Sequence, residues 1–572
     1  MKSFFTFLLL IPVMAFSQSH RMSSGEKNLM PDYLRTVQGY SFDNVTTPPV
    51  SAVRAPAEWE EIDYLMVAWT SFTSIIREIV RAAQSETQVI ILCTDSNAVK
   101  TSLTSASIPL TNVQYLEVPF NTIWSRDYGQ WNIYTNDVDS LALIDWIYNR
   151  PRPSDDTVPR SIERFTGLPM YSMTAAPYDL THTGGNFMVD GFGTAFSSKL
   201  VMDENPTKTE ADIDTIMRRF MGINRYIKME TLPYDDIHHI DMHIKLLDEE
   251  TLLVGEYPQG IADGPQIEAN LQYVLSNFNS VFGTPYKVIR IPMPPDASNS
   301  YPNVGGDYRT YTNSVFVNNT IILPTYSQQY DTTAIRIYHE ALPGYTITGI
   351  NCNSIIPSLG AIHCITKEVA SNDPLLISHQ ALHDTYQTTG TYPVTALIKH
   401  RSGIQSATLY YRTDTTLSYQ AIAMNSLSSQ IDHWGAVIPA QPAGTTVYYY
   451  IEATSVSGKT KTRPMPAPAG YWKFNVLLNT GIAAQEISEP AISNLYPNPS
   501  HGITCIETNF PVNTSAKVTV TNIFGQEIET LFSGIISGEK NFFVETSNYA
   551  AGVYFIDIQS SKGRTVKQFI IN

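Results

Sequence analysis

One strand–helix–strand unit recurs between about Ala55 and Ala370, and this repetition narrows the possible folds more than any other feature of the sequence. Tyr64–Ala68 has the composition of a buried strand, Ile75–Val80 carries the apolar face of a helix, and Gln88–Cys93 predicts the next strand. Further helices are predicted over residues 207–221, 266–282 and 333–342. Repetition at tens of residues predicts an α/β fold with pseudo-symmetry around a central axis.

End signals place two of these helices more closely. Thr207 and Glu210 have the spacing of an N-terminal capping box, and Gly222 follows the predicted last residue of that helix. The helix over 266–282 has apolar residues at helical spacing, and Gly283 is expected to end it.

Beyond Ser371 the pattern changes to short alternating strands without a helical period. About 100 residues of this kind predict an immunoglobulin-like β-sandwich, and a polar linker and another small β unit follow it. We therefore expect a signal peptide at 1–17, a leader at 18–48, a catalytic domain at 49–372, an immunoglobulin-like domain at 373–476, a linker at 477–489 and a small β-sandwich at 490–572.

The N-terminus has the pattern of a secretory signal. Lys2 gives the positive start, Phe4–Phe16 the apolar stretch, and Ala15 and Ser17 a small-residue cleavage site. This stretch is too short to span a bilayer, and no later segment is long and apolar enough to be expected as a transmembrane segment. The predicted leader that follows is polar and shows no clear pattern.

Charge and cysteine content exclude some classes of protein. The net charge is −16, from 53 acidic and 37 basic side chains, which argues against a nucleic-acid partner and would attract cationic substrates. Four cysteines in 572 residues are too few for a disulfide scaffold. A Cys93–Cys352 bridge remains open at this stage, whereas Cys364 is interpreted as a free nucleophile.

Three distant segments contain the groups that the chemistry of a guanidinium would need. Cys364 follows a small-residue turn, His239 and Asp241 lie in a segment predicted as a strand over 237–247, and Asp127 follows Arg126. Alternation in that strand would place His239, Asp241 and His243 on one face. A thiol can attack the guanidinium carbon, and two carboxylates, Asp127 and Asp241, can hold the cation by charge-assisted hydrogen bonds.

Two other interpretations of these residues are possible. His239, Asp241 and a distant histidine resemble the metal ligands of non-haem iron oxygenases, although such a site needs no thiol. Asp127 could instead be a structural partner of Arg126.

Six motifs in order carry a resemblance to a known family. They are Trp124–Trp131, Tyr148–Asp156, Thr183–Asn186, His239–Asp241, Tyr311–Ser314 and Gly360–Cys364. The chain resembles the bacterial peptidylarginine deiminases of the Porphyromonas type, in the agmatine-deiminase branch of the guanidino-modifying pentein superfamily. The resemblance implies a five-bladed pseudo-symmetric α/β propeller that uses neither a cofactor nor a metal for its chemistry.

The same resemblance implies roles for individual residues. Cys364 would form a covalent thiouronium intermediate, His239 would act as acid and base, Asp127 and Asp241 would hold the guanidinium, and Asn313 would order the site. Trp124, Arg150 and Arg152 would bind substrate, the two arginines by gripping the carboxylate of a C-terminal arginine in a peptide or protein.

Two alternatives to peptidylarginine deimination remain. One is agmatine or free-arginine deimination. Arg150 and Arg152 argue against it, and so does Thr183, because agmatine deiminases usually carry an acidic residue at that position. The other is a catalytically inactive surface-binding protein.

The last residues resemble the sorting domain of type IX secretion. The motifs are Leu495–Gly502, Ala551–Tyr554 and Lys567–Ile571. They imply the type IX secretion machinery as a partner and a secreted or cell-surface location.

Overall fold

A computed structural model describes residues 19–39, 45–478, 489–500, 502–547 and 549–572. The predicted signal peptide and most of the predicted linker lie outside these residues. The chain forms two compact units, Met1–Leu477 and Leu478–Asn572. None of the helices in the described ranges has the length and apolar character needed to cross a membrane.

Five small sheets within residues 53–370 repeat one topology. In each, an antiparallel pair of strands is followed by a parallel strand. The sheets are β18-β2-β3-β4 (Lys367–Ala370, Ile62–Ala68, Gln88–Cys93, Val113–Glu117), β1-β5-β6-β7 (Val53–Arg54, Trp131–Thr135, Ser140–Tyr148, Met170–Met173) with β8 (Thr181–His182), β9-β10-β11 (Met188–Val189, Thr194–Ser198, Arg225–Met229), β12-β13-β14 (Ile244–Leu246, Thr251–Glu256, Lys287–Pro292) and β15-β16-β17 (Val315–Val317, Thr320–Thr325, Thr346–Asn351).

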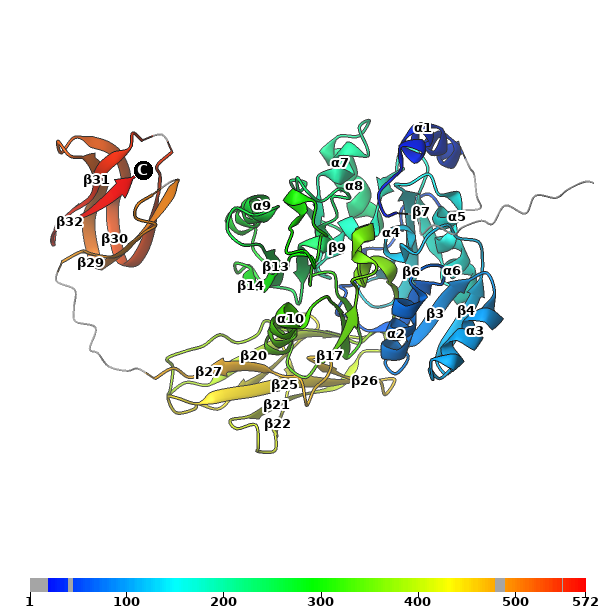
Figure 1. The fold of residues 1–572 in the computed structure, drawn as a ribbon. Coiled ribbons are helices and arrows are strands. Elements are labelled where there is room, and N and C mark those ends of the chain that lie inside the picture. Colours follow the sequence, from blue (N-terminus) through cyan, green and yellow to red (C-terminus); the bar gives the residue numbers. More distant parts are fainter. Residues whose placement is uncertain (1–18, 40–44, 479–488, 501, 548) are drawn as a thin grey trace, which may run out of the picture. The chain divides into compact units, whose positions relative to one another are not determined.

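A helix connects the parallel strands of each sheet, as expected for parallel neighbours, which need a crossover connection. Figure 1 shows α2 and α3 beside β3 and β4, and α9 beside β13 and β14. The helices of this region are α2 (Thr73–Ala83), α3 (Ser96–Ser105), α4 (Ser125–Tyr128), α5 (Pro153–Asp156), α6 (Val158–Thr166), α7 (Leu200–Asp203), α8 (Glu210–Met221), α9 (Gly264–Asn277) and α10 (Gln328–Ala341). Short 3-10 turns are η1 (Gly184–Asn186), η2 (Ile240–Met242), η3 (Pro302–Val304), η4 (Ile356–Ser358) and η5 (His363–Ile365).

The first and last strands of this region pair with each other. β18 runs antiparallel to β2, which joins residues 367–370 to the sheet with which the repeat begins. Apolar helix faces complete the cores, as α2 does by burying Ile75, Ile76 and Ile79. Each such side chain contributes about 1.5–3 kcal/mol when fully buried.

Some predicted helix ends were wrong. The capping box of α8 is formed by Thr209 and Asp212 instead of Thr207 and Glu210, because Asp212 reaches back to the Thr209 backbone and Thr209 accepts from the Asp212 N–H. Helix α9 ends at Asn277, before the predicted Gly283 stop, and α10 begins at Gln328, five residues before the predicted start at 333. The apolar periodicity located the helices but not their ends.

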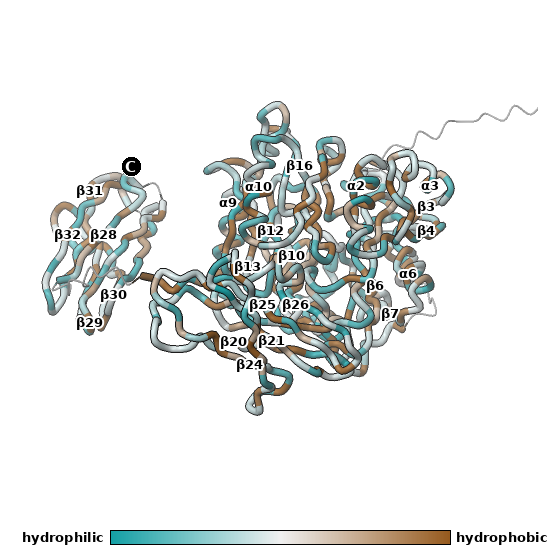
Figure 2. Tube along the Cα trace, turned by 90° about the horizontal axis from the view of Figure 1, so that it is seen from below, coloured by the Kyte–Doolittle hydropathy of each residue, from teal (hydrophilic) through white to brown (hydrophobic). Residues whose placement is uncertain are grey.

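Residues 376–475 form two antiparallel sheets that share one core. Figure 2 shows strands of both sheets lying together, with hydrophobic and hydrophilic residues mixed along them. The sheets are β19-β20-β24-β23 (Leu376–Ser378, Tyr392–Lys399, His433–Ile438, Asn425–Ser426) and β22-β21-β25-β26 (Gln420–Ala423, Ile404–Arg412, Thr446–Ser455, Thr460–Arg463) with β27 (Trp472–Asn475). Lys459 pairs with Glu61, and Ser378 donates to Glu249, so this part packs on the five-sheet region.

The second unit is a five-stranded antiparallel sheet with its own apolar core. It contains β28 (Ala491–Tyr496), β29 (Ile503–Asn522), β30 (Glu527–Glu545), β31 (Gly552–Ser560) and β32 (Gly563–Ile571).

Two features outside the sheets were left open by the sequence. The predicted leader contains a helix, α1 (Ser24–Gly39), which begins where Ser23 and Glu26 bond reciprocally. All four cysteines are free, so the Cys93–Cys352 bridge that the sequence left open does not form.

Candidate active site

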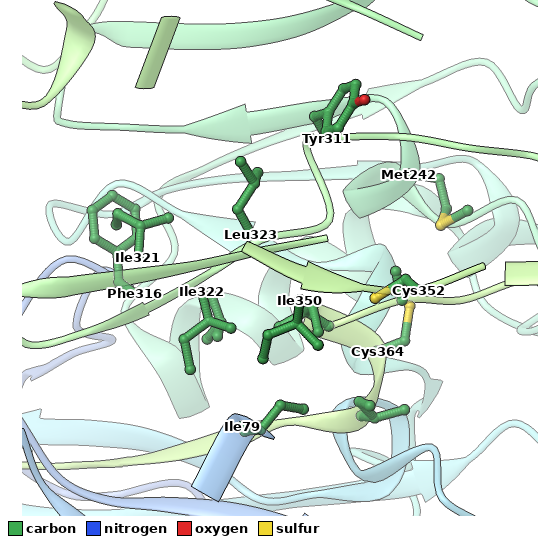
Figure 3. Close-up of a cluster of buried hydrophobic side chains, with 14 of the residues drawn as sticks. Ile79, Met242, Tyr311, Phe316, Ile321, Ile322, Leu323, Ile350, Cys352 and Cys364 are labelled. Carbon is green, nitrogen blue, oxygen red and sulfur yellow. The ribbon is translucent and has the colours of Figure 1, made fainter. Parts of the chain in front are cut away.

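Cys364 lies in the turn η5, directly before β18, and is fully buried. Figure 3 shows it at one end of a hydrophobic cluster to which β15, β16 and β17 contribute Phe316, Ile322 and Ile350. The sequence placed the thiol on a small-residue turn ahead of a strand, and the structure has this arrangement.

Asn313 holds the thiol loop in shape. Its side-chain oxygen accepts from the backbone N–H groups of Ala361, His363 and Cys364, at 3.2, 3.0 and 3.4 Å. Its amide nitrogen donates to the Cys364 Sγ at 3.2 Å. One amide therefore fixes both the loop backbone and the direction of the sulfur.

Gly360 lets the loop approach Trp124 closely. A Cβ on Gly360 would lie 2.5 Å from the indole ring of Trp124 and 3.0 Å from the Cys364 Cβ. Any side chain here would displace the ring or the nucleophile. The Trp124 ring therefore packs against the loop that carries the thiol.

The alternation predicted a strand for His239 and Asp241, and this prediction was wrong. Residues 240–242 form the turn η2, and only Ile244–Leu246 is a strand. Asp235 causes the difference, because its carboxylate accepts from the backbone N–H groups of Ile237 and His239 and turns the chain. His243 has no hydrogen-bond partner for either ring nitrogen and is not part of the thiol site.

The turn nevertheless brings Asp241 to the thiol. The Cys364 Sγ donates to the Asp241 Oδ2 at 3.6 Å. The Oδ1 of Asp127, on α4, lies 3.6 Å from the His239 Nδ1 and accepts from the Gly185 N–H at 3.1 Å. A Cβ on Gly185 would lie 2.5 Å from that Nδ1, so the glycine makes this approach possible.

Arg126 is not the partner of Asp127. Its guanidinium lies 2.8 Å from the Glu368 carboxylate, and its Nε donates to the His363 carbonyl at 3.3 Å. The alternative in which Asp127 is a structural partner of its neighbour is therefore wrong. Asp127 is available to the site.

Burial and neighbouring charges set the protonation of the site. Burial raises the pKa of the Cys364 thiol well above its ordinary value, and the negative charges of Asp241 and Asp127 raise it further. Burial lowers the pKa of His239 to about 4, against the opposing effect of Asp127. Burial alone would raise the pKa of Asp127, but the His20 and His239 rings hold that pKa below its usual value. At neutral pH the resting site therefore has a thiol, a neutral imidazole at His239 and ionised Asp127.

His363 and Glu58 support Asp241 and were missed by the sequence reasoning. The His363 Nδ1 lies 2.7 Å from the Asp241 Oδ2, and its Nε2 lies 3.1 Å from the Glu58 Oε2, so the ring bridges the two carboxylates. Lys245 pairs with Glu58 at 2.8 Å. His363 precedes the thiol directly in the sequence, which was the only signal available for it, because Glu58 lies 305 residues away.

Replacing His363 by alanine should lower kcat/KM about 10- to 100-fold, because Asp241 would lose a charge-assisted hydrogen bond. Steady-state kinetics measure the effect, and His363→Gln, which keeps one donor, should recover part of the rate. If both variants keep the full kcat/KM, Asp241 does not depend on His363 for its position.

The two candidate substrate arginines are buried near Asp127. Arg150 and Arg152 are 5% and 2% exposed. The Arg150 Nε donates to the carbonyl of His20 at 3.3 Å, and an Arg152 terminal nitrogen donates to the carbonyl of Ser19 at 2.8 Å. Both guanidinium groups thus bind oxygen atoms of the N-terminal segment.

His20 enters the site and was not foreseen. Its ring stacks on Trp124, with centroids 4.2 Å apart and an interplanar angle of 6°. Its Nε2 contacts the Asp127 carboxylate, and its ring meets His239 edge-on at 5.0 Å. Among the described residues, His20, Asp127 and His239 form a group whose possible ligand atoms lie within 4.8 Å of one another, close enough to hold a metal ion. This group is not the set of His239, Asp241 and a distant histidine that the sequence suggested.

Two parts of the chain match known protein families. Residues 54–369 match the family described as Porphyromonas-type peptidyl-arginine deiminase, and residues 494–572 match the secretion system C-terminal sorting domain. A protein of Vibrio parahaemolyticus named as an agmatine deiminase is 24% identical over 363 residues, which cover 57% of this chain and 98% of that protein. A Shewanella baltica protein named likewise is 26% identical over 293 residues, covering 46% and 77%.

Solved structures share the fold. A crystal structure from Porphyromonas gingivalis, described as an arginine deiminase, is 20% identical, has a TM-score of 0.50, and covers 56% of this chain and 99% of that one. The family matches over residues 54–369 and 494–572 confirm the resemblances inferred from the sequence motifs. Because the family match runs from β1 to β18, more than half of the chain, this protein belongs to the Porphyromonas-type peptidyl-arginine deiminase family.

Proposed function

We propose that the protein hydrolyses the guanidinium group of arginine to give citrulline and ammonia, with a preference for arginine at the carboxyl end of a peptide. The observation that carries this proposal is a buried thiol placed against Asp241 and near Asp127, with Asn313 holding the thiol loop. We further infer that the five sheets are the blades of a pentein propeller and that residues 373–476 are an immunoglobulin-like domain.

Asp127 and Asp241 would hold the substrate guanidinium between them. Each carboxylate can accept N–H bonds from the planar cation, and such bonds to charged groups contribute about 1.5–3 kcal/mol each. The bound cation would also offset the two negative charges that raise the pKa of Cys364. Substrate binding would therefore promote the thiolate, and the empty site would keep an unreactive thiol.

The reaction would proceed through a covalent intermediate. The Cys364 sulfur forms a bond to the guanidinium carbon while its proton passes to His239. His239 then donates that proton to the departing nitrogen, the carbon–nitrogen bond breaks, and ammonia leaves a thiouronium on the sulfur. Water, deprotonated by His239, attacks the same carbon, and the carbon–sulfur bond breaks to release citrulline and the thiol. His239 then passes the remaining proton to solvent.

Arg150 and Arg152 would bind the carboxylate of the substrate. Both side chains are buried, and both donate to carbonyl oxygens of the N-terminal segment. A carboxylate is a better acceptor for a guanidinium than a carbonyl is. Agmatine has no carboxylate and would therefore lack the charge-assisted hydrogen bonds that a C-terminal arginine could accept from these two guanidinium groups.

A dipeptide ending in free arginine should be converted with a kcat/KM at least about 10-fold higher than its C-terminal amide, because only the acid pairs with both arginines. Colorimetric citrulline detection with the acid, the amide and agmatine makes the comparison. Arg152→Ala should reduce the difference. Equal turnover of acid and amide would remove the role given to Arg150 and Arg152, and preference for agmatine would favour the agmatine-deiminase alternative.

We also infer that the enzyme is exported. The predicted signal peptide at residues 1–17 and the C-terminal sorting domain support passage through the type IX secretion machinery to the cell surface or the medium. The alternative is an inactive surface-binding protein. If none of the substrates gives citrulline, this alternative is favoured.

A further inference from the structure

The N-terminal segment Ser19–Gly39 occupies the place that the proposed substrate needs. We propose that this segment is an intramolecular substrate mimic that keeps the enzyme latent until it is displaced or removed. This inference rests on the proposed function, because it assigns the segment's contacts to the guanidinium and carboxylate subsites.

The His20 ring stands where a substrate guanidinium is expected. It is fully buried, stacks on Trp124 and contacts the carboxylate of Asp127. Its Nδ1 donates to the Leu359 carbonyl at 2.6 Å. Both ring nitrogens face oxygen atoms, one of a carboxylate and one of a carbonyl, so the flat ring presents nitrogens to acceptors as the planar guanidinium would.

The backbone of the segment occupies the carboxylate subsite. The carbonyl oxygens of His20 and Ser19 accept from Arg150 and Arg152, the two residues assigned to the substrate carboxylate. Glu26 adds a carboxylate, whose Oε1 accepts from the Arg152 Nε at 2.8 Å. A planar nitrogen-bearing group and a carboxylate are thus presented together, as in a C-terminal arginine.

Further contacts fix the segment over the thiol loop. The His20 N–H donates to the Ser358 carbonyl at 3.4 Å, and Arg21 pairs with Asp236, which lies shortly before His239. Leu359 and Ser358 immediately precede Gly360 and Cys364. The segment therefore bridges the loops that carry the nucleophile and the imidazole.

Helix α1 itself holds the segment weakly. In Figure 1 the chain ahead of α1 runs toward α4, the helix of Asp127, whereas α1 lies at the surface. Leu29 is 57% exposed, and Tyr33 is the one apolar side chain of α1 that is buried among its described side chains. Most of the attachment is polar and lies at Ser19–Glu26, so displacing the segment exposes little apolar surface.

The geometry makes a kinetic prediction. A tethered competitor raises the apparent KM without changing kcat, because saturating substrate displaces it. In the full-length protein, His20→Ala should lower the KM for a dipeptide ending in arginine about 10-fold or more and leave kcat unchanged. Asn28→Ala, a neutral change at an exposed position of α1, is the matched control and should leave both constants as they are. Glu26→Gln, which removes the Arg152 ion pair, should lower KM in the same direction.

Alkylation of Cys364 tests the inference without turnover. Labelling with a haloacetamidine, whose cationic amidine can pair with Asp127 and Asp241 as the substrate would, should modify Cys364 about 10-fold faster in His20→Ala than in the unaltered chain, as read by peptide mass spectrometry. Cys352, also buried, is the internal reference in each digest. Faster labelling without citrulline from any variant would contradict the proposed function, and with it the mimicry of substrate, while showing that the segment covers the thiol. Unchanged KM and labelling in both His20→Ala and Glu26→Gln would overturn the mimic, and a fall in kcat for His20→Ala would show that His20 takes part in catalysis.

Discussion

Cys364→Ala should reduce citrulline formation by roughly 10⁴-fold or more, since no other group in the described site can form the covalent intermediate. The variant should fold normally. It removes one buried sulfur from a site held by Asn313, and the loop bonds of Asn313 to backbone N–H groups remain. A loss of about 1 kcal/mol would lower Tm by only about 2–4 °C in a domain of some 150–250 residues.

Cys352→Ala is the matched control for this experiment. Cys352 is also a free, fully buried cysteine in the same hydrophobic cluster. Burial raises the pKa of its thiol as well, but it has no carboxylate of Asp127 or Asp241 beside it. The Cys352 variant should keep its activity and show a similar change in Tm. Turnover by Cys364→Ala would mean that the nucleophile is misassigned.

His239→Asn should lower kcat by about 10²- to 10⁴-fold, the usual range for loss of a positioned acid–base group. Asparagine preserves polarity and approximate size beside Gly185, so the close approach of the loops is retained. Stopped or continuous citrulline assays at saturating substrate measure kcat directly. A variant with full kcat would contradict the acid–base role.

The pH dependence gives an independent check on His239. Burial depresses its folded pKa to about 4, whereas its unfolded value is about 6.5, so folding favours the neutral ring. The stability that this group contributes is present above pH 6.5 and is lost as pH falls from there through 4. Unfolding of His239→Asn should therefore be less sensitive to acid over that window. Equal acid sensitivity of the two proteins would contradict the depressed pKa.

The sequence predicted the repeated units and the residues of the site, for reasons that are local. Apolar alternation and helical spacing recur in each unit, and each of the six motifs is short. Helix ends were less certain, since Thr207 and Thr209 both precede an acidic residue by three positions, and only the folded backbone decides which pair bonds.

Other features depend on contacts that no local pattern carries. The segment around His239 alternates as a strand would, but Asp235 turns it into a 3-10 helix by binding two backbone N–H groups. His20 lies 107 residues from Asp127 and 339 from Leu359, in a segment without a clear pattern. Its place in the site follows only from the fold.

Mass spectrometry of enzyme quenched during turnover tests the central claim most directly. We expect an adduct on the Cys364 peptide whose mass equals that of the arginine substrate less ammonia, and we expect no such adduct on Cys352. His239→Asn should prolong the adduct if it slows hydrolysis more than formation. Turnover to citrulline without any adduct on Cys364, at quench times shorter than one turnover, would contradict the account.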